Sequence, residues 1–338
     1  MPDLIYPTNA ELEEIAQVLI PRLAADRPIF DLFPFENVDA STLIWDQEDN
    51  YLGLAQARGL NGNPARISRV GVSRFVMLPG VYGEFSTLDE RELTERRQYG
   101  TFAQPADVSD MVMREQRRLL ERRLDRIEWI LWTLLATGTF SVVGPNNSLL
   151  HTDAYPIQTY TAGTTWATAA TSTPLHDLRQ VQLLHRGQSV SFYRDAIAWV
   201  NLVTLNNMLA NTNNADLYGR RVAGLATVNS PEQLNQLLTM DNLPKVGVYD
   251  EGYLDDAKAF HPFIPDNKAV VVGKRTNNAP VGMFSFTRNA NNPGMAPGPY
   301  MKIVDNGERA VPRNIEIHDG FNGGPKIHYP GAVVLMNV

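Results

Sequence analysis

Cysteine is absent from this 338-residue sequence. Its absence excludes disulfide bonds, thiolate metal sites and cysteine nucleophiles together. The absence of cysteine fits a cytoplasmic protein whose stability does not depend on disulfide formation, although it does not by itself fix the compartment. The length is enough for two domains and for a sizeable apolar core.

Long apolar runs are lacking as well. The longest near-candidate, residues 129–136, is far shorter than the ~20 residues that a membrane-spanning helix needs. The N-terminal segment MPDLIYPTNAELEE is acidic and has no apolar core, so it is not a secretory signal. We therefore expect no membrane partner.

Lysine is scarce and confined to the last third of the sequence. Of 30 basic residues 24 are arginine, and the lysines are Lys245, Lys258, Lys268, Lys274, Lys302 and Lys326. Arginine is favoured where ion pairs are bidentate or partly desolvated, as at subunit interfaces, although genomic base composition also enriches it. The net charge of −7 means that the surface as a whole is not built to attract nucleic acid.

Recognisable catalytic motifs are missing. No HExxH or GxxxxGK[ST] occurs, and GVSRF at 71–75 lacks the second glycine of a nucleophile elbow. His318-Asp319 fits a surface turn at the end of a strand better than a metal or proton-relay site. Asp255-Asp256 lies on a predicted helix, where adjacent side chains face apart. A Ser/His/Asp set assembled only in space stays open, but the sequence indicates no catalytic residue, no metal and no cofactor.

The strongest element is a helix predicted over residues 105–138. The segment has no proline after Pro105 and no glycine before Gly138, so about thirty good helix formers span ~45 Å at 1.5 Å per residue. Apolar residues recur at three-and-four spacing along one face: Val108, Met111, Val112, Leu119, Leu120, Leu124, Ile127, Leu131 and Leu134. A helix of this length exceeds what one small domain can cover.

Its other face carries more arginines than acids. Arg117, Arg118, Arg122 and Arg123 belong to this face, and Arg118 with Arg122 is a like-charge pair that mildly destabilises an isolated helix. A solvated charged face is the simpler interpretation. The surplus of guanidinium groups also fits contacts with carboxylates from another subunit, and we list these four residues as candidates for such contacts.

Residues 1–45 are predicted to form an arm. Thr8 with Glu11 makes a capping-box pattern, and a short apolar stripe follows before Pro21, where we expect the helix to end. Phe30, Phe33 and Phe35 need burial that a short helix and a proline-broken strand do not supply. The arm should therefore lie on another surface, either of its own subunit or of a neighbour.

Residues 46–100 are predicted to hold strands in RISRVGVSRFVML and VYGEFSTL. From residue 50 to residue 83 there are four arginines and no acid: Arg58, Arg66, Arg69 and Arg74. A basic β-hairpin ahead of a long helix is typical of a projecting loop. A solvated hairpin and a nucleic-acid-binding hairpin are the alternatives. Few aromatic residues lie between the arginines, which speaks against the nucleic-acid interpretation.

The rest of the sequence alternates strands and helices. Strands are predicted in FSVVG, SLLHTDAYPIQTYT, PKVGVYDEG, KAVVVGK and VGMFSFT, and helices after Thr173-Pro174, in NLVTLNNML and in SPEQLNQLLTM. Residues 288–300 are a loop by composition. The C-terminal segment is predicted as a strand, a glycine-rich turn and a final strand. The order of elements makes α+β the fold class.

This order of parts resembles a known family. The features that carry the resemblance are the short arm, the arginine-rich hairpin, the long charged helix, a TW…P..DL segment, AIAWVNLVTLNNML, FIPDNKAVVVGK and the closing PGAVVLMNV. Together they resemble the major capsid proteins of tailed phages, closest to the lambda-type capsid protein E family with the Hong Kong 97-type fold.

The resemblance implies a division of the chain and a set of partners. It implies an N-terminal arm (1–45), an extended loop (46–100), a peripheral domain with the spine helix (101–173, completed by 320–338) and an axial domain (174–319). The chain would form hexamers and pentamers of an icosahedral virion shell assembled in the host cytoplasm. The implied partners are a scaffolding protein, a portal and a decoration protein, with only weak non-specific contact to packaged DNA.

Two other functions stay open at this point. An encapsulin-type nanocompartment shell would use the same fold, and an unrelated soluble enzyme with a long helix is a further alternative. Two expectations follow from the capsid interpretation. Only about 45 residues precede the extended loop, fewer than the ~50 of a small domain, so we expect a separate scaffolding protein. The loop has no lysine, so we expect no covalent isopeptide lock of the kind that needs a lysine amine.

Overall fold

The computed structural model describes residues 7–48, 71–95, 107–144, 148–186, 190–212, 230–255, 257–275, 279–307 and 311–338, with scattered positions between 54 and 66. The predicted long helix is confirmed as α4 (Val108–Thr137), which begins after Asp107 and ends at Gly138. Gly138 is left-handed (φ 72°), and its N–H donates to the carbonyl of Leu134. All nine apolar residues predicted for the buried face are buried.

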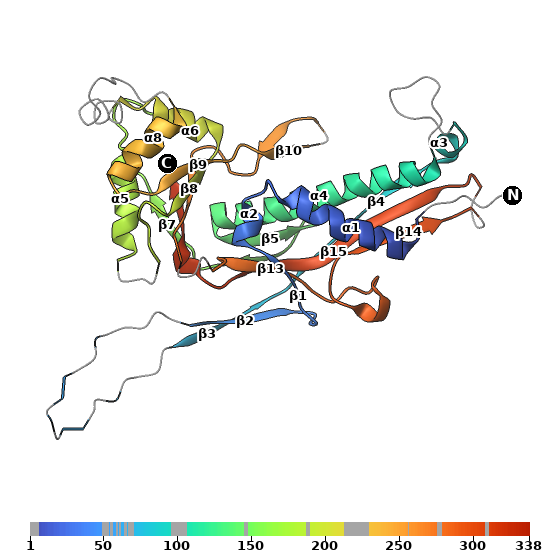
Figure 1. Cartoon of the computed structure of the whole chain (residues 1–338), viewed down its shortest axis with the longest axis horizontal. Coiled ribbons are helices and arrows are strands. Elements are labelled where there is room, and N and C mark those ends of the chain that lie inside the picture. Colours follow the sequence, from blue (N-terminus) through green and yellow to red (C-terminus); the bar gives the residue numbers. More distant parts are fainter. Residues whose placement is uncertain are drawn as a thin grey trace.

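Helix α4 lies along a five-stranded sheet, here called the long sheet (Figure 1). Its central strand β15 (Ile315–Ile327) pairs antiparallel with β4 (Gly80–Leu88), β14 (Tyr300–Asp305) and β13 (Gly282–Phe286). The short strand β1 (Phe35–Asn37) adds to β13 in parallel. The long sheet therefore combines segments from the beginning and the end of the chain.

The predicted glycine-rich turn near the C-terminus is wrong, because residues 315–327 form one continuous strand. Its glycines serve close packing. A Cβ on Gly320 would come within 2.6 Å of the Tyr82 carbonyl oxygen, and one on Gly323 equally close to that of Ser285. His318 and Asp319 accordingly lie inside this strand and not in a surface turn.

A second five-stranded sheet, here called the end sheet, lies at one end of α4 (Figure 1). Its strand order is β7 (Gln158–Thr161), β16 (Val333–Asn337), β12 (Lys268–Val272), β8 (Ile197–Val200) and β9 (Lys245–Val248). Helices α5 (Pro174–Leu184), α6 (Leu202–Leu209) and α8 (Pro231–Met240) pack with it around a separate apolar cluster. These elements confirm the predicted strands and helices of this region.

The arm folds onto its own subunit. Helix α1 (Asn9–Ala24) has the predicted Thr8/Glu11 capping box, but it does not end at Pro21. The helix continues for another turn because packing of Leu23 and Ala24 against the core offsets the hydrogen bond that proline cannot make. In α2 (Ile29–Leu32) and directly after it, three phenylalanines pack in or against the main apolar cluster of the same chain: Phe30, Phe33 and Phe35.

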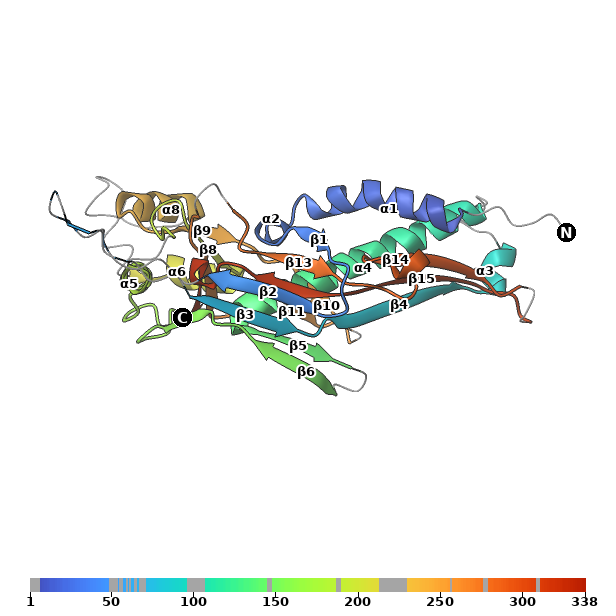
Figure 2. The ribbon, with the colours of Figure 1, turned by 90° about the horizontal axis from the view of Figure 1, so that it is seen from below.

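Among the described residues, three two-stranded hairpins lie outside the two five-stranded sheets. They are β2 (Leu43–Glu48) with β3 (Val72–Met77), β5 (Thr139–Val143) with β6 (Leu149–Ala154), and β10 (Gly252–Leu254) with β11 (Phe260–Pro262). Strands β2 and β3 lie below the long sheet in Figure 1, and Figure 2 shows α1 and the β5–β6 hairpin on opposite sides. The predicted strand VYGEFSTL is β4, so it belongs to the long sheet and not to the projecting hairpin.

The segment around Asp255 forms the turn of the β10–β11 hairpin and not the predicted helix. The Asp255 carboxylate binds the Ala259 N–H and lies 3.0 Å from His261 Nε2, so local hydrogen bonds explain it. The remaining short elements of the described residues are α3 (Glu90–Glu95), η3 (Pro293–Met295) and η4 (Pro330–Ala332). Helices and strands are mixed along the chain, which confirms the α+β class.

Within the described ranges, no helix has the length and apolarity needed to cross a bilayer. The same ranges contain no cluster of three or more histidine and acidic side chains arranged to hold a metal ion.

Candidate functional site

Three of the four candidate arginines of α4 are exposed and lie beside acidic side chains of the same chain. Arg117 Nε lies 3.0 Å from Glu121 Oε1 one turn along the helix, and Arg122 makes a two-bonded pair with Glu84 of β4 at 2.5 and 3.0 Å. Arg118 is 70% exposed and lies 3.9 Å from Glu115. These three remain at the surface, where a neighbouring subunit can reach them, and their intersubunit role stays a prediction.

Arg123 is in a different position from the other three. Its side chain is buried, and Nη1 donates to Asp319 Oδ1 of β15 at 2.7 Å. Both side chains are only 5% exposed. Arg123 thus joins α4 to the long sheet inside one subunit, and we no longer place it among the intersubunit candidates.

A groove of about 450 Å³ runs between β4 and α4. It is lined by Gly83, Glu84, Phe85, Ser86, Glu115, Arg118, Leu119 and Arg122. Ser86 Oγ donates to Glu115 Oε2 at 2.7 Å across it. Its lining combines ion pairs with an exposed aromatic ring, which suits contact with another protein surface better than catalysis.

The hairpin arginines are described only in part. Arg74 on β3 pairs with Asp46 on β2 at 2.8 Å, with both side chains exposed. Arg58 donates to the Gly62 carbonyl at 3.0 Å, and Arg66 is exposed. Arg69 lies outside the described residues. The structure therefore brings one of the four into an ion pair of its own hairpin and leaves their intersubunit role as a prediction.

The β2–β3 hairpin has two different faces. On the inner face, Trp45 stacks on Phe75 and Tyr155, and its indole N–H donates to the Ile327 carbonyl at 2.9 Å. On the outer face the cross-strand pair Ile44 and Val76 is 55% and 60% exposed. The hairpin is thus anchored at its base and presents apolar side chains outward.

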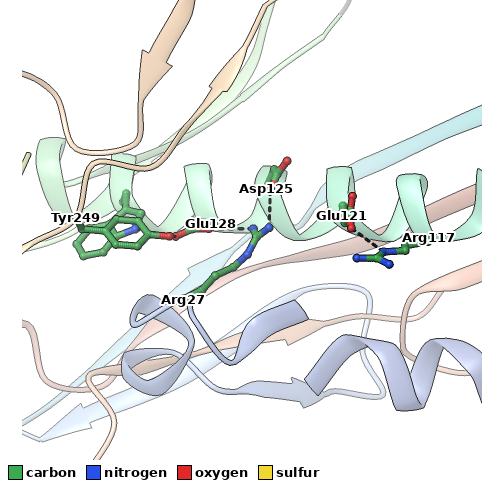
Figure 3. Close-up of polar contacts among 7 residues, drawn as sticks. Arg27, Arg117, Glu121, Asp125, Glu128 and Tyr249 are labelled. Carbon is green, nitrogen blue, oxygen red and sulfur yellow. Dashed lines mark hydrogen bonds and ion pairs between the residues drawn. The ribbon is translucent and has the colours of Figure 1, made fainter. Parts of the chain in front are cut away.

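A buried polar network lies near the middle of α4 (Figure 3). The Glu128 carboxylate accepts hydrogen bonds from Arg27 Nη1 at 2.9 Å, from the Tyr249 hydroxyl at 2.5 Å and from Trp132 Nε1 at 3.2 Å. Arg27 also pairs with Asp125 at 2.7 Å. Sequence reasoning missed this network. Its one visible signal is that Glu128 falls on the apolar face, four residues after Leu124 and three before Leu131.

Burial dominates the electrostatics of both buried carboxylates. Burial raises the pKa of Glu128 above its ordinary value, and the donors Tyr249, Arg27 and Trp132 only partly oppose this. Burial likewise raises the pKa of Asp319 to about 6, against the opposing charge of Arg123. The pKa of the Tyr249 phenol is also raised, by burial and by Glu128, so it remains a hydrogen-bond donor.

Comparison with known proteins adds a family and a fold. The model of the family described as phage major capsid protein E matches residues 22–315. A protein of Escherichia coli CFT073 described as a prophage capsid protein is similar in structure, with a TM-score of 0.57, 13% identity and coverage of 96% of this chain and 98% of that one.

Two further solved structures share the fold. A phage-related protein from Bordetella bronchiseptica RB50 has a TM-score of 0.50 and 10% identity, with coverage of 95% of this chain and 96% of that one. The capsid of Myoviridae phage XM1 has a TM-score of 0.50 and 10% identity, with coverage of 88% of this chain and 85% of that one.

Proposed function

The chain belongs to the phage major capsid protein E family, and from this premise we propose how its surfaces build a shell. It is a major capsid protein, whose copies form hexamers and pentamers of the icosahedral head that encloses the double-stranded DNA of a tailed phage. Its place is the virion capsid, and it is a structural protein and not an enzyme. The encapsulin alternative is not favoured.

We propose that the chain is divided into four structural units. Residues 1–45 act as the arm and residues 46–79, which hold most of the β2–β3 hairpin, as the extended loop. Helix α4 with the long sheet forms the peripheral domain, and the end sheet with α5, α6 and α8 forms the axial domain. The bounds implied by the resemblance (46–100, 101–173 with 320–338, and 174–319) change accordingly, because β4, β13, β14 and β15 belong with α4, and β7 and β16 belong with the end sheet. The separate apolar cluster around the end sheet supports an axial unit. The position of β4 in the long sheet argues that the loop ends before residue 80.

The β2–β3 hairpin is the surface that we propose to contact the neighbouring subunit. The observation that carries this proposal is the pair of faces described above: Trp45 fixes the base, while Ile44 and Val76 are exposed on the outer face. Apolar side chains in that arrangement are stabilised when a second subunit covers them. The exposed arginines Arg117, Arg118 and Arg122 are proposed as polar contacts of the same assembly.

Photocrosslinking in assembled particles tests the hairpin contact. A benzophenone amino acid in place of Val76 should give crosslinked dimers in intact shells and none in dissociated subunits. The same group in place of Phe75, whose ring stacks on Trp45 of its own chain, is the matched control and should crosslink within the chain. Dimers of equal yield from both positions, or from neither, contradict the proposed contact.

Further partners are proposed from the family membership. They are a scaffolding protein and a portal during assembly in the host cytoplasm, and a decoration protein on the mature shell. Packaged DNA should be contacted weakly and without sequence preference, because the net charge is −7. Co-purification of assembling particles from infected cells, followed by mass spectrometry of their proteins, tests this set. Particles at every stage that contain this chain alone contradict it.

A further inference from the structure

Glu128 connects three segments that are far apart in the sequence (Figure 3). Arg27 comes from the linker between α1 and α2, Trp132 lies one turn further along α4, and Tyr249 directly follows β9 of the end sheet. All three donate to one carboxylate whose side chain is 1% exposed. The arm, the long helix and the end sheet therefore meet at a single acceptor.

Tyr249 is firmly attached to the end sheet. Its backbone N–H donates to the Val200 carbonyl of β8 at 2.9 Å. Its ring stacks on Trp132 at 5.6 Å, and Trp132 in turn meets the edge of Trp199 of β8 at 6.1 Å. A change in the angle between the end sheet and α4 must move Tyr249 relative to Glu128.

The polar contact has a property that the surrounding apolar contacts lack. The apolar contacts of stacked rings and aliphatic side chains are largely non-directional. A charge-assisted hydrogen bond weakens steeply when its distance or direction changes, and it is about twice as strong as a neutral one. The bond from Tyr249 to Glu128 thus selects one orientation among those that apolar packing allows.

We propose that Glu128 is a positioning residue that fixes the angle between the end sheet and α4, and thereby the size of the shell. The second half of the statement rests on the proposed function in assembly. A subunit whose two sheets meet at one angle builds capsomers of one curvature, whereas a subunit with a variable angle closes into shells of several diameters. Arg27 links the arm to the same carboxylate.

The angle can be followed by double electron–electron resonance (DEER), which measures the distance between two spin labels. Because the chain has no cysteine, spin labels attach only at introduced sites. Met113→Cys on α4 and Met240→Cys on α8 report the angle, since both side chains are exposed. Met113→Cys with Val81→Cys of β4 stays within the long-sheet part and is the internal control. Labelled subunits are diluted into an excess of unlabelled ones, so that distances between subunits do not contribute.

Tyr249→Phe removes one hydroxyl and keeps the ring, so it tests the contact with the smallest risk to folding. We expect the 113–240 distance distribution to broaden in Tyr249→Phe and Glu128→Gln, while the 113–81 distribution stays as in the wild type. Glu121→Gln breaks the exposed pair with Arg117 on the same helix and should change neither distribution. Negative-stain images of the same samples should show shells of several diameters for the first two variants alone.

The two measurements separate the two claims. An unchanged 113–240 distribution in Tyr249→Phe and Glu128→Gln overturns the positioning role, whatever the shells look like. A broadened distribution with shells of one diameter overturns the link to shell size and leaves the positioning role in place. When each chain is produced together with the other head proteins of its phage, absence of shells from wild type and variants alike counts against the assembly function, and the distance data still decide the positioning role.

Discussion

Arg123 on α4 and Asp319 on β15 form a buried ion pair with 2.7 Å between Nη1 and Oδ1, although 196 residues separate them in the sequence. The pair lies under the long helix, where water does not replace either partner. It ties the helix to the central strand of the long sheet. Its energetics and its pH dependence are therefore open to direct measurement on the subunit.

Removing one partner of this pair should be far more costly than removing both. Arg123→Leu or Asp319→Leu leaves an uncompensated buried charge, and we expect each to lower the free energy of unfolding by ~3–5 kcal/mol. The double leucine variant should recover most of that loss, because an apolar pair can replace a buried ion pair at little cost. Urea unfolding of unassembled subunits measures all four. Additive losses in the double variant contradict this account.

The same pair should make stability depend on pH in a defined direction. The pKa of Asp319 is raised from 3.8 to about 6, so between these values the folded chain holds a proton that the unfolded chain has released. The contribution of Asp319 to the free energy of unfolding is fully present below pH 3.8 and is lost as the pH rises through about 6. The unfolding free energy of the wild type should therefore fall relative to the double leucine variant across this window. A constant difference refutes the assignment.

The basic hairpin should be needed for assembly and not for folding. Arg66, Arg69 and Arg74 replaced together by glutamate should give a folded subunit that does not form shells. Each exposed pair is worth only ~0.2–1 kcal/mol, but the contact is repeated in every copy of the shell. Circular dichroism checks folding, and electron microscopy checks assembly. Arg91→Glu on α3 is the control, since it breaks an exposed pair with Glu95 and should leave assembly intact. Normal shells from the triple variant would falsify the docking role of the hairpin.

Mature shells should contain no covalent link between subunits. The described lysines lie in the second half of the chain, and several are engaged within it, such as Lys326 with Glu36 at 2.6 Å and Lys268 with Asn337. With no cysteine and no lysine before residue 245, the hairpin has no nucleophile for such a link. Particles boiled in denaturant should therefore run as one band near 37.7 kDa. A ladder of multimers would show that a late lysine, such as Lys274 or Lys302, has this role.

Local patterns in the sequence predicted local elements well. The three-and-four spacing of apolar residues predicted α4, and the Thr8/Glu11 pattern predicted the start of α1, because both depend on neighbours a few residues away. Predictions from sequence patterns were wrong where tertiary packing overrides local preference. Pro21 sits inside a helix because Leu23 and Ala24 of the following turn pack, partly buried, against the main apolar cluster. Gly320 and Gly323 sit inside a strand because neighbouring backbone leaves no room for a side chain.

The polar contacts inside the subunit could not be predicted in the same way. The charged face of α4 was visible in the sequence, but which arginine turns inward was not, since the partner of Arg123 is 196 residues away. Of the donors to Glu128, Arg27 and Tyr249 are 101 and 121 residues away. Such contacts depend on how the two sheets are placed around α4, which no local spacing encodes.

Electron cryomicroscopy of particles built from this chain, produced together with the other head proteins of its phage, tests the central claim most directly. The account predicts closed icosahedral shells in which this one chain forms both the hexamers and the pentamers, with the β2–β3 hairpin of each subunit lying on its neighbour. A preparation that yields only compact 37.7 kDa monomers by light scattering and no shells would contradict it.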